Sequence, residues 1–427
     1  MANTKSLVVP SISQSPKPTK VIITSNVDAN KKPDLIGGFA FLEYHENIFA
    51  DTNRISYAFV DTGIQGQTIK ESLPLYNSED IEFEFADNNG VKLKPKFVVN
   101  QNITTEQTAT TSTILLKCVS EEILRNECEE SICNDSYQGT ISDHVKNILK
   151  NNLKSQKNID AENGSTYNFN GNRHKSLYTL NWLSKHDTPS KKGDTAGFLF
   201  FETSEGYKYK SIDFLFNQKP KKRFIMNDST EVPQPYDGKI LDIFLADQSD
   251  ATTKLRSGVV VNELITFNPR ERKFGKDKKE LRSNVESGRD FAKFNKKFLS
   301  SITRTTFAMT DTGSQNTNGS TKQQVQKNNE SNFDVQSILN QSIKRYNEID
   351  SQKTSITIAG DFELHVGDTI FIDVRSLSDQ IDNLDKFIGG KYLITDLCHR
   401  MDSTGVFTKL NLQRDKFKRG SVNRGPL

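Results

Sequence analysis

Residues 196–216 read AGFLFFETSEGYKYKSIDFLF. In an extended strand Phe198 and Phe200 project to one face, because side chains alternate along a strand. Leu199 and Phe201 then project to the other face, so both faces are apolar and need cover from the rest of the chain. Burying each ring contributes about 1.5–3 kcal/mol, and the stretch therefore predicts a hairpin that forms the nucleus of its domain. Such a hairpin is also typical of an ordinary α+β core, which is compatible with any function.

Two further stretches show the pattern of half-buried strands. Residues 81–85, IEFEF, alternate apolar and acidic residues and are followed by the hairpin signal DNNG at 87–90. Residues 360–374, GDFELHVGDTIFIDV, contain a turn that needs Gly367 for its backbone geometry, before a strand of alternating apolar residues. The first stretch predicts an early antiparallel β-barrel or sandwich, and the second predicts a small barrel late in the chain.

Length and composition favour several small domains. The chain has 427 residues, more than one core usually serves, and 34% of them are hydrophobic. The predicted fold class is α+β, mainly β, with two small antiparallel β-barrel domains and an intervening α+β region. The expected divisions are a flexible N-terminal arm at 1–34, a first β-barrel at 35–119, an α+β domain at 120–218, the first part of the second barrel with a polar loop (311–332) at 219–332, a helix with the rest of that barrel at 333–415, and a tail at 416–427.

Four helices are predicted from capping signals and apolar periodicity. The first follows Ser120 as a capping serine and carries Cys128 and Cys133. The second starts at Thr140, with an acidic residue three positions on as a capping-box variant. The third covers residues 174–186 and is expected to lie on one face of the phenylalanine-rich strand. The fourth, at 334–348, is clearly amphipathic.

Charge and cysteine content exclude several function classes. Lys plus Arg number 57 against 54 for Asp plus Glu, so no global field for nucleic acid is expected. One short basic run is interpreted as a solvated inter-domain turn; it comprises Lys219, Lys221, Lys222 and Arg223. The four cysteines include no CxxC pair, which indicates reduced thiols rather than a zinc site. No signal-peptide core or membrane-spanning run of roughly 20 apolar residues is present, so a soluble protein assembled in a cytoplasm is expected.

Enzymatic motifs are missing from the sequence. No GxSxG, HExxH, Walker-type loop or GxGxxG occurs, and the six histidines are scattered. His174 and His186 stand too far apart on one helix to share a metal ion. Glu43 and Glu46 are expected to be surface charges, although a carboxylate pair that cuts glycan could not be detected by spacing. We therefore predict no catalytic residues, no cofactor and no metal, and a protein that is not an enzyme.

Together these stretches resemble the baseplate hub proteins of contractile-tailed phages of the T-even-like group, which are related in fold to the hub part of type VI secretion spikes. The resemblance is carried by GFLFFETSEGYKYKSIDFL at 197–215, IAGDFELHVGDTIFIDV at 358–374 and GGKYLITDLCHRMDSTGVFTKLNLQRD at 389–415. It covers the middle of the chain loosely and residues 1–34 not at all. The structural residues of these motifs are Phe198, Phe201, Glu202, Gly206, Ser211, Asp213, Gly367, Asp368, Gly390, Tyr392 and His399.

The resemblance implies a structural role without bond chemistry. Two tube-like barrels per chain and three chains would form a pseudo-sixfold ring between the sixfold tail tube and a trimeric central spike. The implied partners are two further copies of the chain, the central spike protein, tail tube or tube-initiator proteins and baseplate wedge proteins. DNA would pass through the ring without specific binding, and the protein would belong to the tail baseplate of the virion. A wedge or fibre-attachment subunit and a tail-associated cell-wall hydrolase are the alternatives.

Overall fold

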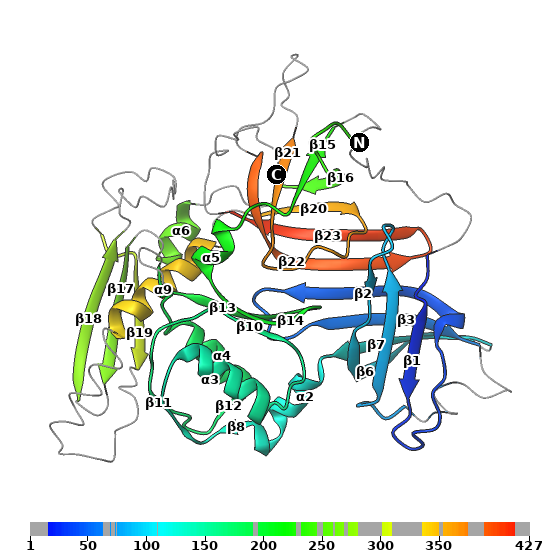
Figure 1. Cartoon of the computed structure of the whole chain (residues 1–427), viewed down its shortest axis with the longest axis horizontal. Helices are drawn as coiled ribbons and strands as arrows, with labels where there is room; N and C mark the ends of the chain where they lie inside the picture. Colours follow the sequence, from blue (N-terminus) through cyan, green and yellow to red (C-terminus); the bar gives the residue numbers. More distant parts are fainter. Residues whose placement is uncertain are drawn as a thin grey trace.

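The fold is seen in a computed structural model that describes residues 16–62, 69, 73, 75–108, 110–190, 195–227, 232–245, 251–258, 261–268, 272–280, 301–309, 335–349, 353–374 and 388–414. One continuous thirteen-stranded sheet joins the two ends of the chain (Figure 1). Its strands are β1 (Lys20–Thr24), β2 (Phe39–Asn47), β3 (Arg54–Asp61), β4 (Asp80–Ala86), β5 (Lys92–Leu93), β6 (Lys96–Gln107), β7 (Ser112–Val119), β15 (Lys222–Met226), β16 (Gly238–Phe244), β20 (Lys353–Ala359), β21 (Thr369–Val374), β22 (Gly390–Asp402) and β23 (Gly405–Gln413).

The first half of this sheet is an antiparallel unit in the order β1-β4-β6-β7-β3-β2, with β5 paired to β4. The short helix η1 (Ile36–Gly38) precedes β2. The alternation seen in residues 81–85 places Ile81, Phe83 and Phe85 in the core and the glutamates outside. The predicted strand and its turn are confirmed, since Gly90 adopts φ +82° where β4 leads into β5.

The second half closes into a barrel of six strands, β22-β21-β15-β16-β20-β23, because β23 pairs back onto β22. Strand β15 pairs in parallel with β16 and β21, and the remaining pairings are antiparallel. The two halves are joined by the antiparallel pair β2–β22, whose register runs from Phe41↔Asp402 to Asn47↔Asp396. The predicted fold class, α+β and mainly β, is confirmed, and the described strands include one closed six-stranded barrel.

The expected N-terminal arm is partly incorrect, because residues 20–24 form strand β1. This strand pairs with β4 over five residues, and Val21 and Ile23 are buried in the core of the first unit. Side chains alternate along this strand, so Val21 and Ile23 face the core while Lys20, Ile22 and Thr24 on the other face are only partly buried. Residues 1–15, the polar loop expected at 311–332 and the tail expected at 416–427 lie outside the described residues.

The α+β region packs beside the sheet and has its own core. Its elements are α2 (Glu121–Glu127), η2 (Glu129–Ser131), β8 (Ile132–Cys133), β9 (Ser136–Tyr137), α3 (Ile141–Asn147), η3 (Ile148–Asn152), β10 (Ile159–Ala161), β11 (Phe169–Asn170), β12 (His174–Lys175), α4 (Ser176–Ser184), β13 (Phe198–Thr203), β14 (Gly206–Ser211) and α5 (Ile212–Asn217). Strands β10, β14 and β13 form a three-stranded sheet, on which α4 packs.

The structure confirms the cap of the second predicted helix and changes the bounds of the first and the third. Thr140 accepts a hydrogen bond from the Asp143 amide, as the capping box predicts. The third helix begins later than expected, because His174 belongs to strand β12. The first helix does not carry both cysteines, since Cys133 lies in β8. Its end is fixed by the Ser131 hydroxyl, which donates to the carbonyls of residues 126 and 128 at 2.8 Å each.

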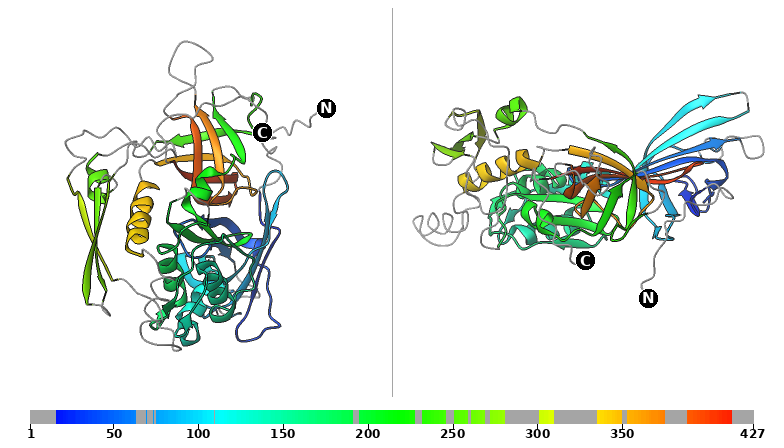
Figure 2. Two further views of the ribbon diagram at one scale, coloured as in Figure 1. Left: turned by 60° about the vertical axis from the view of Figure 1, so that its left-hand side comes forward. Right: turned by 90° about the horizontal axis from the view of Figure 1, so that it is seen from above.

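A third sheet stands at the far side of the α+β region. It contains β18 (Lys273–Glu280), β17 (Val261–Asn268) and β19 (Arg304–Met309), in that order, with α6 (Ala251–Ser257) nearby. The predicted amphipathic helix is confirmed as α9 (Val335–Ile349), which packs on β17 and β18. Figure 2 shows this sheet and the β6–β7 strands at opposite ends of the molecule.

Candidate functional site: the junction around the β13–β14 hairpin

The β13–β14 hairpin belongs to two hydrophobic cores at once. Phe198 and Phe200 lie in the core of the α+β region, where each ring stacks on a tyrosine of β14 at centroid distances of 4.8 and 5.4 Å. Leu199 and Phe201 lie in the core of the barrel. The predicted division of the two faces is confirmed, and this strand couples the packing of two cores.

Glu202 is buried at the end of β13 and is held by three donors. Its Oε2 accepts hydrogen bonds from the Asn53 amide at 2.9 Å and from the Ser120 hydroxyl at 2.7 Å. Its Oε1 lies 2.7 Å from the Nζ of Lys157, which also pairs with Glu122 at 2.6 Å. Burial raises the pKa of the Glu202 carboxyl, and the charge of Lys157 offsets only part of this shift. Ser120 therefore holds Glu202 and does not cap α2, which corrects the prediction.

Glu46 of β2 ties the tip of the hairpin to both β units. It is 0% exposed because its side chain projects to the same buried face of β2 as Leu42 and Tyr44, so the expected surface charge is incorrect for this residue. Its carboxylate accepts hydrogen bonds from the Ser204 amide at 2.7 Å and the Val366 amide at 3.1 Å. The Tyr44 hydroxyl donates to it at 2.9 Å, and His365 Nδ1 lies 3.4 Å from Oε1.

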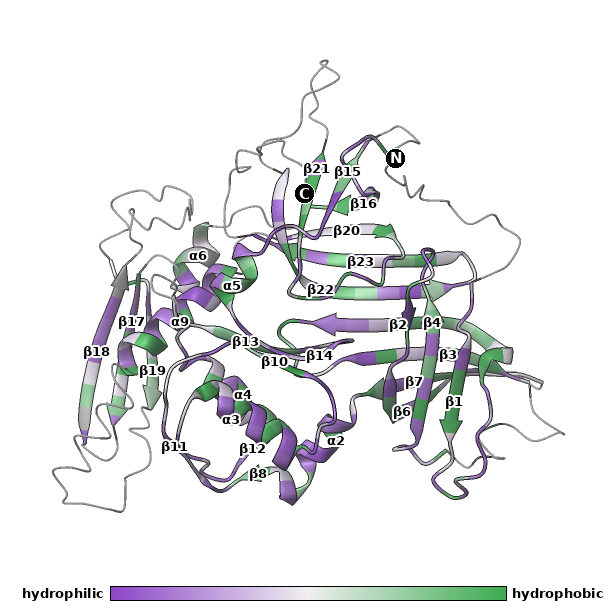
Figure 3. Ribbon diagram, viewed as in Figure 1, coloured by the Kyte–Doolittle hydropathy of each residue, from purple (hydrophilic) through white to green (hydrophobic). Residues whose placement is uncertain are grey.

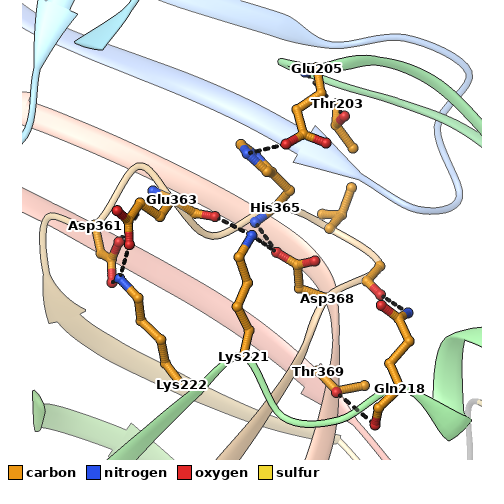
Figure 4. A network of polar contacts seen from close by, with 12 residues as sticks. Thr203, Glu205, Gln218, Lys221, Lys222, Asp361, Glu363, His365, Asp368 and Thr369 are labelled. Carbon is orange, nitrogen blue, oxygen red and sulfur yellow. Dashed lines mark hydrogen bonds and ion pairs between the residues drawn. The ribbon is translucent and has the colours of Figure 1, made fainter. Parts of the chain in front are cut away.

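His365 is the titratable neighbour of this carboxylate. Burial lowers the pKa of His365, but the hydrogen bond and the charge of Glu46, together with the charge of Asp368, outweigh burial and raise it overall. Its Nε2 lies 3.9 Å from the Glu205 carboxylate at the hairpin tip, an arrangement visible in Figure 4. The imidazole thus bridges the barrel turn and the hairpin. Glu43, by contrast, is partly exposed and pairs with an arginine of β22 at 2.9 Å.

Two lysines of the basic run pair with acids of the loop that precedes β21 (Figure 4). Lys221 Nζ lies 2.8 Å from Asp368 Oδ2. Lys222 Nζ lies 2.6 Å from Asp361 Oδ2 and 2.8 Å from Glu363 Oε2. The last two residues of the run begin strand β15 and are not part of a turn, because that strand pairs with β21. These ion pairs join the start of β15 to the loop between β20 and β21 within the barrel, and they neutralise the charges of Lys221 and Lys222.

Two motif residues fix α5, the helix that follows the hairpin. The Ser211 hydroxyl accepts a hydrogen bond from the Phe214 amide at 3.2 Å and donates to Glu162 at 3.1 Å, so it caps the helix. The Asp213 carboxylate lies 2.9 Å from Nη2 of Arg345, whose side chain is almost fully buried. A buried ion pair thus links α5 with α9.

The motif glycines are required by backbone geometry or by close approach. Gly206 adopts φ +123°, and a Cβ there would lie 2.3 Å from the carbonyl oxygen of Asn158. Gly367 adopts φ +86°, and its Cβ would lie 2.8 Å from the ring of Phe201. Gly390 opens β22 with φ +148°. The barrel turn and the hairpin therefore touch at a contact that only glycine permits.

His399 and Tyr392 are buried residues of β22. The His399 ring stacks on Tyr44 of β2 with 10° between the planes, and its Nδ1 lies 2.9 Å from the Thr408 hydroxyl across the strand pair. Burial lowers the pKa of His399 well below its ordinary value, so the ring is neutral at neutral pH. The Tyr392 hydroxyl donates to the carbonyl of Ile388 at 2.6 Å. His399 therefore supports the packing between the two β units, and Tyr392 packs in the core of the barrel.

The described residues contain neither a metal-ligand cluster nor a membrane-length helix. Within the described ranges, no group of three His, Cys, Asp or Glu side chains is placed to hold a metal ion. No helix in those ranges is both long and apolar enough to cross a membrane. His186 is buried, and burial lowers its pKa to about 4, while its Nδ1 lies 2.8 Å from the carbonyl of Trp182. All four cysteines are free.

Three residues of the junction were missed by sequence reasoning. Glu46 follows Leu42 and Tyr44 at period two on the buried face of β2, so strand alternation could have found it. Arg345 lies four residues before buried Ile349 in α9, so helical spacing places it on the buried stripe. For Lys157, no local pattern exists, because its partners come from distant parts of the chain.

Comparisons with known proteins place this architecture among phage tail proteins. No family model and no curated protein matches the sequence. The 43 kDa tail protein of prophage MuSo2 from Shewanella oneidensis superimposes with a TM-score of 0.55 and 9% identity, covering 93% of this chain and 99% of that one. The tail protein from Neisseria meningitidis MC58 superimposes with a TM-score of 0.53 and 9% identity, covering 93% and 97%. The chain shares the fold of these tail proteins over nearly its whole length.

Proposed function

We propose that this protein is the baseplate hub subunit of a contractile phage tail. Three copies would form a pseudo-sixfold ring that adapts the sixfold tail tube to a trimeric central spike and encloses the DNA channel. The partners would be the spike protein, tail tube or tube-initiator proteins and baseplate wedge proteins. The protein would act in the virion through binding geometry, without catalysis, cofactor or specific contact with DNA.

One observation carries the proposal: each chain contains two β units, of seven and six strands, in one continuous sheet. The first is β1-β4-β6-β7-β3-β2 and the second is the closed barrel, and the β2–β22 pair joins them. Two units per chain and three chains give six units around an axis, which is the number a sixfold tube requires. The fold shared with two phage tail proteins supports the same reading.

The junction supports a role that depends on rigid geometry. Glu46 accepts hydrogen bonds from the hairpin and the barrel while standing in the first unit. Glu202 of the α+β region accepts hydrogen bonds from the Asn53 amide, which lies in the first unit, and from the Ser120 hydroxyl, which precedes α2. Buried carboxylates with several donors fix the relative placement of the elements that supply those donors. An adaptor ring needs this property, since the two units of one chain must hold a constant relation.

The test is the oligomeric mass of the purified full chain, measured by light scattering, followed by electron microscopy. We expect a species of three chain masses, each 48.3 kDa, that appears as a ring with a central hole. A chain that stays monomeric both alone and with its spike would overturn the hub proposal and favour a wedge or fibre-attachment subunit. Clearing of cell-wall material in a zymogram would instead favour a tail-associated hydrolase.

A further inference from the structure

Helix α9 lies between the three-stranded sheet β18-β17-β19 and the α+β region (Figure 1, Figure 2). Toward the sheet, Asn340 of α9 accepts a hydrogen bond from the Asn262 side-chain amide at 2.7 Å and donates one to the Asp277 carboxylate at 2.8 Å. Asn347 donates to the carbonyl of Ser257 in α6 at 2.7 Å. These contacts join α6, β17, β18, β19 and α9 into one unit, which we call the side module.

A second set of contacts joins α9 to the junction around the β13–β14 hairpin. Arg345 Nη2 lies 2.9 Å from Asp213 Oδ1, and the guanidinium lies 5.4 Å from the centre of the Phe216 ring. The Tyr346 hydroxyl donates to the carbonyl of Phe198 and lies 3.1 Å from the Ser184 hydroxyl. The side module is therefore held against α4, β13 and α5 by an ion pair and hydrogen bonds.

The buried positions of α9 are mainly polar. Its six buried residues are Leu339, Asn340, Ser342, Arg345, Glu348 and Ile349. Figure 3 shows hydrophilic and hydrophobic residues together along this helix. Polar groups that separate regain hydrogen bonds with water, so a polar interface costs less free energy to open than an apolar core of the same size. Polar interfaces between parts of one chain are accordingly the places where relative motion is expected.

Arg345 is suited to hold the side module in one of two positions. Its Nη1 also lies 3.3 Å from Glu348 of the same helix, so the guanidinium keeps a charged partner when α9 moves away from Asp213. The Asp213 carboxylate regains water at the same time. In the closed position both side chains are almost fully buried, and a buried charge that lacks its partner is strongly destabilising. The closed position is therefore stable only while the ion pair is complete.

We propose that the side module opens from the junction and closes onto it as a unit, with the Arg345–Asp213 ion pair as its latch. Ile349, the last residue of α9, lies in the barrel core and is the pivot. The hairpin and the two β units keep their places, because Glu46 and Glu202 hold them through other contacts. The molecule thus combines a rigid junction with one part that can adapt to a neighbouring molecule. The inference concerns the single chain and does not rest on the hub proposal.

Thiol labelling of the full-length protein detects the opening at Ser342. This residue of α9 is 0% exposed, and its Cα lies 3.7 Å from where a Cβ on Gly197 would stand, at the start of β13. Within the described residues its hydroxyl has no hydrogen-bond partner, so Ser342→Cys removes no described hydrogen bond. A thiol at this position can react with dithionitrobenzoate only when α9 leaves the hairpin.

The native cysteines supply the references. Cys128→Ser and Cys398→Ser remove the exposed and the partly exposed thiol. Cys118 and Cys133 stay, because they are buried in the cores of the first β unit and the α+β region. Without denaturant, the Ser342→Cys thiol is expected to react at least about tenfold faster than both reference thiols, because local opening costs less than global unfolding. Equal rates would mean that position 342 is exposed only by unfolding, and would overturn the proposal.

Arg345→Met tests the latch itself. It should speed the labelling of Ser342→Cys by about a hundredfold or more, because the closed position then buries an unpaired Asp213, while the reference thiols keep their rates. The matched control is Arg125→Met, which removes the same charge from a helix but from an exposed pair, and it should change no rate.

Tyr346→Phe gives a second measurement if the methionine variant does not fold. It keeps the ring and removes the hydrogen bonds of the hydroxyl, so labelling of Ser342→Cys should speed up by about two- to tenfold. An unchanged labelling rate in both variants would overturn the latch. Equal acceleration of all three thiols would show that these contacts support the whole fold, and would overturn it as well.

Discussion

Replacing Lys157 by methionine should destabilise the protein strongly. Lys157 Nζ lies 2.7 Å from Glu202 and 2.6 Å from Glu122, and both carboxylates are almost fully buried. Methionine keeps the length of the aliphatic chain but removes the charge, so two buried carboxylates lose their common partner. Removing one partner of a buried ion pair typically costs about 3–5 kcal/mol. The hydrogen bonds from Ser120 and Asn53 to Glu202 remain, so we expect the lower half of that range.

The matched control is Lys154→Met, three residues earlier in the same segment. Lys154 pairs with Glu130 at 2.6 Å, but the two side chains are 52% and 76% exposed. An ion pair exposed to water contributes about 0–1 kcal/mol. The two variants remove the same charge from the same loop, so any difference between them reports the burial of the partners and not the change of net charge.

Both variants can be followed by urea unfolding with tryptophan fluorescence. The chain has a single tryptophan, Trp182 of α4, which packs 5.4 Å from the Phe169 ring in the core of the α+β region. We expect the unfolding midpoint of Lys157→Met to fall well below that of Lys154→Met. Equal midpoints would refute the account of Glu202 as a buried charge held by lysine. Adding Glu202→Gln to Lys157→Met should restore part of the loss, because one unpaired charge is then removed.

The same variant has a defined dependence on pH. Burial favours a higher pKa for Glu122, but the charge and hydrogen bond of Lys157 outweigh it and lower the pKa overall. A lowered folded-state pKa contributes stability above the unfolded-state pKa of about 4.3, and that contribution is lost as the pH falls. The difference in unfolding free energy between the wild type and Lys157→Met should therefore shrink below about pH 4.3. A difference that grows on acidification would contradict the assigned ion pair.

Two further predictions concern the contact between the hairpin and the barrel turn. Gly367→Ala should lower the unfolding free energy by about 2–4 kcal/mol, because Gly367 has a positive φ and a Cβ there would clash with the ring of Phe201. The control, Gly37→Ala, should change the unfolding free energy by under about 0.5 kcal/mol, because the space around that Cβ is open. Denaturant midpoints measure both effects, and equal effects would contradict the contact. His365→Gln should cost more stability at about pH 5.5 than at about pH 8.5, because a raised folded-state pKa adds stability below the unfolded-state value of about 6.5 and loses it as the pH rises. A cost independent of pH would mean that Glu46 does not hold a protonated imidazole.

The strands of the cores could be predicted because their signals are local. The two faces of the Phe198 strand, the turn after residue 86 and the cap at Thr140 each depend on a few neighbouring residues, and each is found in the structure. Strand β1 was missed because it is short and lies in a segment rich in proline and lysine. Its stability comes from pairing with β4, which lies about sixty residues away in sequence. The strand propensity of a short segment does not reveal whether such a distant partner exists.

The polar network of the junction was largely beyond prediction for the same reason. Glu202 was selected as a motif residue, but its three donors come from residues 53, 120 and 157. A serine before an acidic helical turn predicts a cap, and here the hydroxyl of Ser120 instead satisfies a buried carboxylate that is costly to leave unpaired. The need to pair a buried carboxylate thus outweighs the preference of a serine at this position to cap the helix.

The hairpin explains how a chain of several small cores can keep one shape. Its side chains divide between two cores, and near its tip Ser204 and Glu202 contact Glu46 and Lys157. None of the three packed regions can rotate against another without breaking a buried contact, since interiors repack in steps and do not deform smoothly. In the proposed ring, two β units of one chain must match six equivalent positions of a tube. A loosened hairpin would therefore disturb the ring geometry before it unfolded the chain, which makes assembly a more sensitive readout than stability.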